Sequence, residues 1–175
     1  MWARGFRPFF LLAALYAAVA PPAWIAAIRG LVPAPAWLDA PAWHGHEMIF
    51  GFVGAAVAGF LLTAVPVWTG RAPLEGPRLA GLALLWLAGR AASWASGLLP
   101  PGLVAAVDAA FLPALAVALA PSLLARDQRR NLGILAAVSG LAGANLAFHL
   151  GALGWIGAPP SRLLRVAVDL VVVLL

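Results

Sequence analysis

The stretch HGHEMIFGFVGAAVAGFLLTAVPV, residues 44–67, decides the fold of this chain. Beyond Glu47 it carries no charged side chain, and a helix of about 20 apolar residues crosses the roughly 30 Å hydrocarbon core of a bilayer. The stretch therefore predicts a spanning helix from about His46 to Val67. Histidines and a glutamate stand at its entry, although lipid-facing helix surfaces avoid such side chains.

The rest of the chain has the composition of a membrane protein. Hydrophobic residues make up 64% of it and charged residues 10%, with a mean hydropathy of +0.98, whereas a soluble domain has about 25% charged residues. The apolar runs are continuous, unlike the alternating strands of a spanning barrel. The sequence thus predicts an all-α, polytopic transmembrane helix bundle of about six spans. The predicted spans cover residues 9–28, 46–67, 79–98, 103–124, 131–153 and 162–175.

Short connections and the absence of a hydrophilic linker predict that residues 1–175 form a single membrane domain. Its last span is truncated, because a helix from Arg162 to Leu175 is about 21 Å long and the hydrocarbon core is about 30 Å thick. A chain end inside the bilayer would leave backbone carbonyls and a carboxylate in lipid. We therefore expect this chain to be the N-terminal part of a longer membrane protein.

The arginines orient the predicted bundle, because loops on the cytoplasmic side of a membrane are enriched in basic residues. One side of the bundle has the larger set: Arg4, Arg7, Arg71, Arg78, Arg126, Arg129 and Arg130. The other side has Arg29, Arg162 and Arg165. The N-terminus is therefore predicted to be cytoplasmic. The chain has no cysteine, which excludes disulfides, thiolate metal sites and cysteine nucleophiles.

Polar side chains within the predicted spans gather toward the outer membrane face. His44, His46, Glu47 and His149 fall near this face, Asn145 lies one helical turn below His149, and Asp108, Asp169 and Arg90 lie deeper. A charge inside a spanning helix costs about 2.5–3.5 kcal/mol on insertion scales. These side chains are therefore expected to pair with one another, with water or with a cofactor. A purely structural ion pair of Arg90 with Asp108 or Asp169 is one alternative.

The histidines are the candidate metal ligands, because imidazole binds haem iron, copper and zinc. His44 and His46 point about 200° apart on a regular helix, so they cannot share one metal there. Either residue 44 lies outside the helix and both flank one site, or the two histidines serve different sites. Close packing of the second and fifth spans would bring His46 to His149. Small residues that favour close packing repeat every four positions at Gly51, Ala55 and Gly59, and at Ala136, Gly140 and Ala144.

Several segments resemble the NnrS family along the whole chain. They are GFRPFFLLAALYA (5–17), WHGHEMIFGFVGAAVAGFLLTAVP (43–66), LLWLAGR (84–90), RNL (130–132), and AN with FHL (144–150). The element HGHEM-x-FGF is the most specific of them.

The resemblance implies a bacterial inner-membrane protein that contains haem and copper and acts in nitric oxide metabolism or resistance to nitrosative stress. It also implies about twelve spans, so that a C-terminal half would be missing here. On this interpretation His44, His46 and His149 are candidate ligands of haem or copper, and Glu47 and Asn145 are their hydrogen-bonding partners. Arg90, Arg29 or Arg162 are candidate partners of haem propionates. Nitric oxide is the expected small-molecule ligand and the lipid bilayer the surroundings.

Two other functions stay open on the sequence alone. Arg90, Asp108 and Asp169 inside the bilayer are also typical of a proton-coupled transporter or channel, and a purely structural subunit would need none of the histidines. The sequence contains no nucleophile triad, phosphate loop or nucleotide fingerprint. It therefore leaves open whether the protein is an enzyme.

Overall fold

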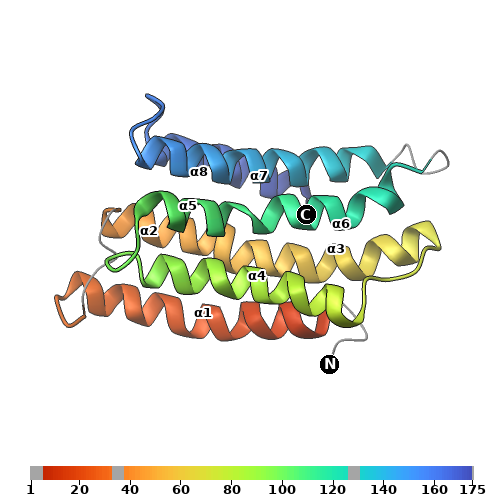
Figure 1. The fold of residues 1–175 in the computed structure, drawn as a ribbon, viewed down its shortest axis with the longest axis horizontal. Coiled ribbons are helices and arrows are strands. Elements are labelled where there is room, and N and C mark those ends of the chain that lie inside the picture. The colour runs from red at the N-terminus through yellow and green to blue at the C-terminus, as the bar shows by residue number, and fades with distance from the viewer. Residues whose placement is uncertain (1–5, 33–37, 126–130, 175) are drawn as a thin grey trace.

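The computed structural model describes residues 6–32, 38–125 and 131–174. These residues form helices and no strand, and the helices lie roughly side by side in one bundle (Figure 1). The predicted all-α fold class is therefore confirmed.

The helices fall into six segments along the chain. Their bounds are α1 (Phe6–Ile28), α2 (Ala40–His46), η1 (Glu47–Val53), α3 (Gly54–Thr69), α4 (Gly76–Trp94), α5 (Pro101–Ala109), α6 (Phe111–Leu123), α7 (Leu132–Ala152) and α8 (Pro160–Leu174). Here η1 is a stretch of π-helix, and α2, η1 and α3 run on without a break. Only Ala110 separates α5 from α6.

Helices long and apolar enough to cross a membrane account for four of these segments in the described chain: Arg7–Ile28, Ala40–Thr69, Pro101–Leu123 and Leu132–Ala152. Helix α4 and the 15-residue α8 complete the set of six. The protein is thus a polytopic membrane protein. Large apolar side chains on the outside of the bundle, such as Val117 and Leu84, are 72% and 63% exposed, as a surface in contact with lipid tails would be.

The second segment begins earlier than predicted, at Ala40 instead of about His46. Asp39 caps it, because its Oδ1 accepts a hydrogen bond of 2.7 Å from the backbone nitrogen of Ala42. Pro41 stands in the first turn, where its missing N–H costs nothing. His44 therefore lies within a regular helix, and the alternative that places it outside the helix is wrong.

Helix α3 packs against α1 and α6, α4 packs against α5, and α7 packs against α6 and α8. The core between these helices contains Leu61, Leu79, Leu115 and Leu141, each at most 1% exposed. The break at Ala110 has a local cause: Pro113 has no N–H to donate to the carbonyl of Ala109. This break lies two residues after Asp108.

The small-residue repeats do not pack the second and fifth segments against each other as expected. A methyl group added to Gly59 would meet Phe9 and Phe10 of α1 at 3.1–3.2 Å, and one added to Gly140 would meet Leu170 of α8 at 3.3 Å. These glycines therefore admit large side chains of α1 and α8. Where α2 and η1 face the end of α7, His46 and Phe50 contact Asn145, Phe148 and His149.

Helix α1 begins, α3 ends and α4 begins at the same end of the bundle (Figure 1). Arg7, Arg71 and Arg78 are at these helix ends. The other arginines that orient the predicted bundle on this side, Arg4, Arg126, Arg129 and Arg130, lie outside the described residues. A cytoplasmic N-terminus stays a prediction.

Candidate metal centre

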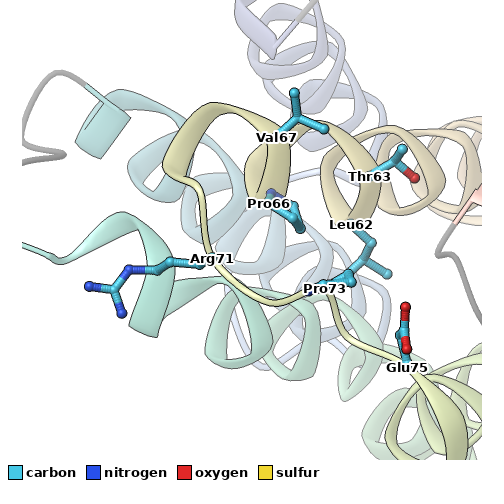
Figure 2. A pocket seen from close by; sticks show the side chains of 7 residues that line it. All are labelled: Leu62, Thr63, Pro66, Val67, Arg71, Pro73 and Glu75. Carbon is cyan, nitrogen blue, oxygen red and sulfur yellow. The ribbon is translucent and has the colours of Figure 1, made fainter.

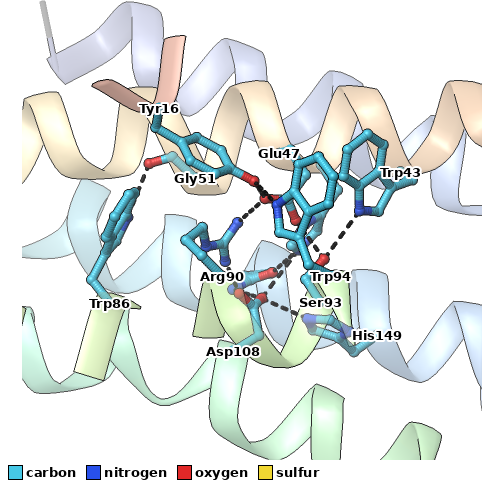
Figure 3. A network of polar contacts seen from close by, with 12 residues as sticks. Tyr16, Trp43, Glu47, Gly51, Trp86, Arg90, Ser93, Trp94, Asp108 and His149 are labelled. Atoms are coloured by element: carbon cyan, nitrogen blue, oxygen red, sulfur yellow. Dashed lines mark hydrogen bonds and ion pairs between the residues drawn. The ribbon is translucent and has the colours of Figure 1, made fainter. Parts of the chain in front are cut away.

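A cluster of buried polar side chains occupies the bundle at the end away from the start of α1. Residues of α2, η1, α4, α5 and α7 form this cluster (Figure 3). We call it the polar cluster, and its members are His46, Glu47, Arg90, Ser93, Asp108, Asn145 and His149, each 0–6% exposed. Charged groups so far from water need partners within the protein.

Arg90 joins the two carboxylates of the polar cluster. Its Nη1 donates to Oε2 of Glu47 at 2.7 Å, and its Nη2 pairs with Oδ1 of Asp108. The predicted pairing of Arg90 with Asp108 is therefore present, and Glu47 is an additional partner. With neutral histidines, two carboxylates and one guanidinium leave the polar cluster with one net negative charge.

Asp108 also contacts both histidines of the polar cluster. Its Oδ2 lies 3.1 Å from Nε2 of His46 and 2.7 Å from Nε2 of His149. The ring centroids of the two histidines are 5.0 Å apart. The structure thus brings together His46 and His149, as expected from their common depth, and places a carboxylate between them.

His46 has polar contacts at both ring nitrogens and packs against two phenylalanine rings. Its Nδ1 lies 3.2 Å from Oε1 of Glu47, and its Nε2 lies 2.9 Å from Oδ1 of Asn145. The rings of Phe50 and Phe148 pack against it with centroid distances of 4.9 and 4.7 Å. Both ring nitrogens face carboxylate or amide oxygens, which accept hydrogen bonds and cannot donate them. All of these contacts are satisfied only if both nitrogens carry a hydrogen, or if a metal ion takes the place of the hydrogen on Nε2.

Glu47 is fixed by residues that sequence reasoning did not assign to the site. Tyr16 of α1 donates its hydroxyl hydrogen to Oε2, and Ser93 of α4 donates to Oε1 at 2.7 Å. Trp43 then donates to the Ser93 hydroxyl at 3.1 Å, and Trp94 donates to the Tyr16 hydroxyl at 3.0 Å. Tyr16 is the only tyrosine of the chain, and a lone hydroxyl in an apolar helix is a signal that could have pointed to it.

The π-helix η1 shapes this part of the site. A π-turn widens the helix and releases backbone groups from their usual partners, and the carbonyl of Gly51 accepts a hydrogen bond of 3.0 Å from Nε1 of Trp86. Gly51 also leaves room for the guanidinium, because an added methyl group would lie 2.8 Å from Nη1 of Arg90. A larger residue at this position would therefore have to displace the guanidinium that pairs with Glu47.

Two predicted site residues lie away from the polar cluster. His44 is half-buried, and its ring stacks on Trp24 of α1 with a centroid distance of 4.1 Å. Asp169 is exposed on α8, because the opposite face of that helix carries Ala167, which is 0% exposed in the core. The expectation that Asp169 joins the buried polar residues is wrong for the described chain.

The donor set of His46, Asp108 and His149 suits a single small metal ion. One nitrogen or oxygen atom from each of these residues lies within 4.8 Å of the others, and all three residues are buried. Glu47 on the other nitrogen of His46 adds the carboxylate–histidine pair that usually orients a metal-binding imidazole. Imidazole with carboxylate suits copper as well as iron or zinc.

The same histidine pair does not suit a haem. A porphyrin ligated by both residues would have to separate two Nε2 atoms that now share one Asp108 oxygen. The phenylalanine rings on His46 and its hydrogen bond to Asn145 would also have to move. Among the predicted ligands, His44 is the one that could take part in haem binding without dismantling the polar cluster.

Three open pockets lie away from the polar cluster. One of about 400 Å³, near the turn from α3 to α4, is shown in Figure 2. Its lining residues are Leu62, Thr63, Pro66, Val67, Arg71, Pro73 and Glu75. None of them belongs to the polar cluster, so the candidate metal centre is distinct from this pocket.

The model of the NnrS family, described as NnrS protein, matches residues 1–175, the whole chain. Among curated proteins and solved structures, nothing matches the chain.

Proposed function

Because the chain belongs to the NnrS family, we propose that it is a haem- and copper-containing membrane protein of nitric oxide metabolism or of resistance to nitrosative stress. The observation that carries the proposal is the buried group of His46, Asp108 and His149. We assign copper to this group and leave haem outside it. Copper, when bound, supplies a centre to which nitric oxide can coordinate.

Side chains of the chain are arranged so that they could bind a copper ion. His46 and His149 offer Nε2 atoms that face one oxygen of the Asp108 carboxylate, and a metal ion on His46 would take the place of the contact between its Nε2 and Asn145. Glu47 accepts the hydrogen on Nδ1 of His46 and thereby fixes the tautomer whose Nε2 faces the metal. Phe50 and Phe148 keep water away from His46, and nitric oxide, which is small and nearly apolar, can reach the site through lipid.

The haem part of the proposal involves His44. This histidine stacks on Trp24 between α1 and α2, and its Nδ1 is buried without a hydrogen-bond partner. It stands outside the polar cluster, so haem and copper would occupy different sites in the protein. Of the two interpretations of His44 and His46, the one with separate sites is favoured.

We place the protein in the bacterial inner membrane with a cytoplasmic N-terminus, in keeping with its family and with the arginine distribution. The lipid bilayer and nitric oxide are the proposed partners.

The test is metal and haem analysis of the purified full-length protein. We expect copper to be lost in His46→Ala and His149→Ala and retained in His44→Ala, while the haem Soret band weakens only in His44→Ala. Retention of both copper and haem in all three variants would mean that the assignment is wrong. Absorption spectra with and without nitric oxide would show whether the bound centres react with it.

The second candidate is a proton-coupled transporter or channel. It is supported by the buried chain of charges from Glu47 through Arg90 to Asp108, since such residues also mark ion pathways in membranes. Flux into vesicles that persists in metal-free protein and needs Asp108 would favour this function over the first.

A further inference from the structure

The charged side chains around the candidate copper site determine its net charge. Asp108 carries a negative charge at the site, and Glu47 carries a second one behind His46. Arg90 bonds to both carboxylates and is 6% exposed. It therefore cancels one of the two negative charges where solvent can do little to screen them.

The net charge of the polar cluster together with its ion depends on the charge of that ion. With neutral histidines, the polar cluster carries one net negative charge, so a singly charged ion makes it neutral. A doubly charged ion leaves one uncompensated positive charge. Uncompensated charge is costly inside a bilayer-spanning bundle.

We propose that Arg90 biases the oxidation state of the bound metal, so that its charge raises the affinity of the centre of His46, Asp108 and His149 for Cu(I) relative to Cu(II). This inference rests on the proposed function, because it concerns the same copper site. Among common singly charged ions, Cu(I) accepts imidazole nitrogen. Sodium and potassium ions instead favour sets of oxygen ligands.

The position of Arg90 supports an electrostatic role. It touches neither His46 nor His149 in the contacts described and bonds instead to the carboxylates beside them. Gly51 leaves space for its Nη1, and the Trp86 ring lies 5.9 Å from its guanidinium carbon. Arg90 is thus a positioning residue that acts on the metal through its charge, at a fixed place.

The test compares affinities for Cu(I) and Cu(II) in the purified full-length protein after chelation of bound metal. Cu(I) is supplied anaerobically with ascorbate and a Cu(I) chelator as competitor, and Cu(II) is supplied with a Cu(II) chelator. The measured quantity is the ratio of the two affinities. In Arg90→Gln we expect this ratio to move toward Cu(II) by about tenfold or more, from the loss of one nearby charge.

Three other variants separate charge from folding. Arg90→Lys keeps the charge and should keep the ratio near that of the wild type. Glu47→Gln removes a negative charge and should move the ratio toward Cu(I), opposite to Arg90→Gln. Arg165→Gln is the matched control, because Arg165 is exposed on α8, and it should leave the ratio unchanged.

The possible failures are distinguishable. If Arg90→Gln and Glu47→Gln weaken both ions by the same factor, the inference is overturned while the copper site stands. An unchanged ratio in Arg90→Gln overturns it as well. If the wild type binds copper in neither state, the proposed function fails and the inference fails with it.

Discussion

The Nε2 atom of His149 lies 2.7 Å from Oδ2 of Asp108, although 41 positions separate the two residues in the chain. This contact joins α7 to α5 at the point where the fourth segment breaks, next to Ala110. The same oxygen reaches His46 of α2. One carboxylate therefore connects three segments, and its removal should destabilise the bundle.

The first prediction concerns this carboxylate. Asp108→Asn removes the partner of Arg90 and leaves its guanidinium with one buried partner, which is typically a loss of about 3–5 kcal/mol in the free energy of unfolding. We expect a clearly lower melting temperature for the purified protein in detergent. Asp169→Asn is the matched control, because Asp169 is exposed, and it should change stability by less than about 0.5 kcal/mol. Equal effects of the two substitutions would contradict the structure.

The second prediction concerns the glycine beside Arg90. In Gly51→Ala the new methyl group would lie 2.8 Å from Nη1 of Arg90 and 3.0 Å from the Tyr16 ring, so the ion pair with Glu47 must shift. Such overpacking typically costs about 1–3 kcal/mol. Thermal unfolding should show this loss, and copper content should fall with it if the site holds copper.

Gly54→Ala provides the comparison for Gly51→Ala. Both glycines are buried in the second segment, but the nearest atom to a methyl group at Gly54 is 3.8 Å away. That is an ordinary packing distance, so stability and copper content should stay close to those of the wild type. Tight packing at Gly51 would be refuted if the two alanine variants behaved alike.

The sequence was sufficient to predict the six helical segments, because each is a continuous apolar run bounded by prolines, glycines or charges. It was also sufficient to predict that His46 and His149 share one end of the bundle and that Arg90 finds a carboxylate partner. These expectations depend on depth along a helix, which follows from counting residues.

The sequence was not sufficient to predict how the helices are rotated about their axes. Asp108 and Asp169 were equally plausible partners of Arg90, yet Asp108 faces the core and Asp169 faces outward. The π-helix at Glu47–Val53 changes the direction of every side chain after it and leaves no clear signature in composition. Tyr16 was missed because its partner Glu47 is 31 positions away.

The third prediction tests the hydroxyl of Tyr16. Tyr16→Phe removes one of the hydrogen bonds to Glu47, but Arg90 still bonds to the same carboxylate oxygen. We therefore expect a loss of about 1 kcal/mol in the free energy of unfolding, near the typical contribution of one hydrogen bond. Tyr16→Phe also leaves Trp94 without its acceptor, but Trp94 is exposed. Ser93→Ala removes a donor to the other oxygen and leaves the buried Trp43 without its acceptor, so its effect should be at least as large. Thermal unfolding in detergent measures both, and a Tyr16→Phe variant as stable as the wild type would argue against the contact.

The fourth prediction concerns the turn from α7 to α8, which holds α8 against the bundle. A methyl group added to Gly151 would lie 2.5 Å from the carbonyl oxygen of Ala158, and a backbone atom cannot move aside without shifting the turn. Gly151→Ala should therefore destabilise the protein by about 1–3 kcal/mol and loosen α8. Gly143→Ala, an exposed position on the same helix with no atom within 4 Å of the added methyl, should be neutral or stabilising by up to about 1 kcal/mol, because alanine favours helix. Limited proteolysis between α7 and α8, together with thermal unfolding, measures the difference, and faster cleavage is expected only in Gly151→Ala.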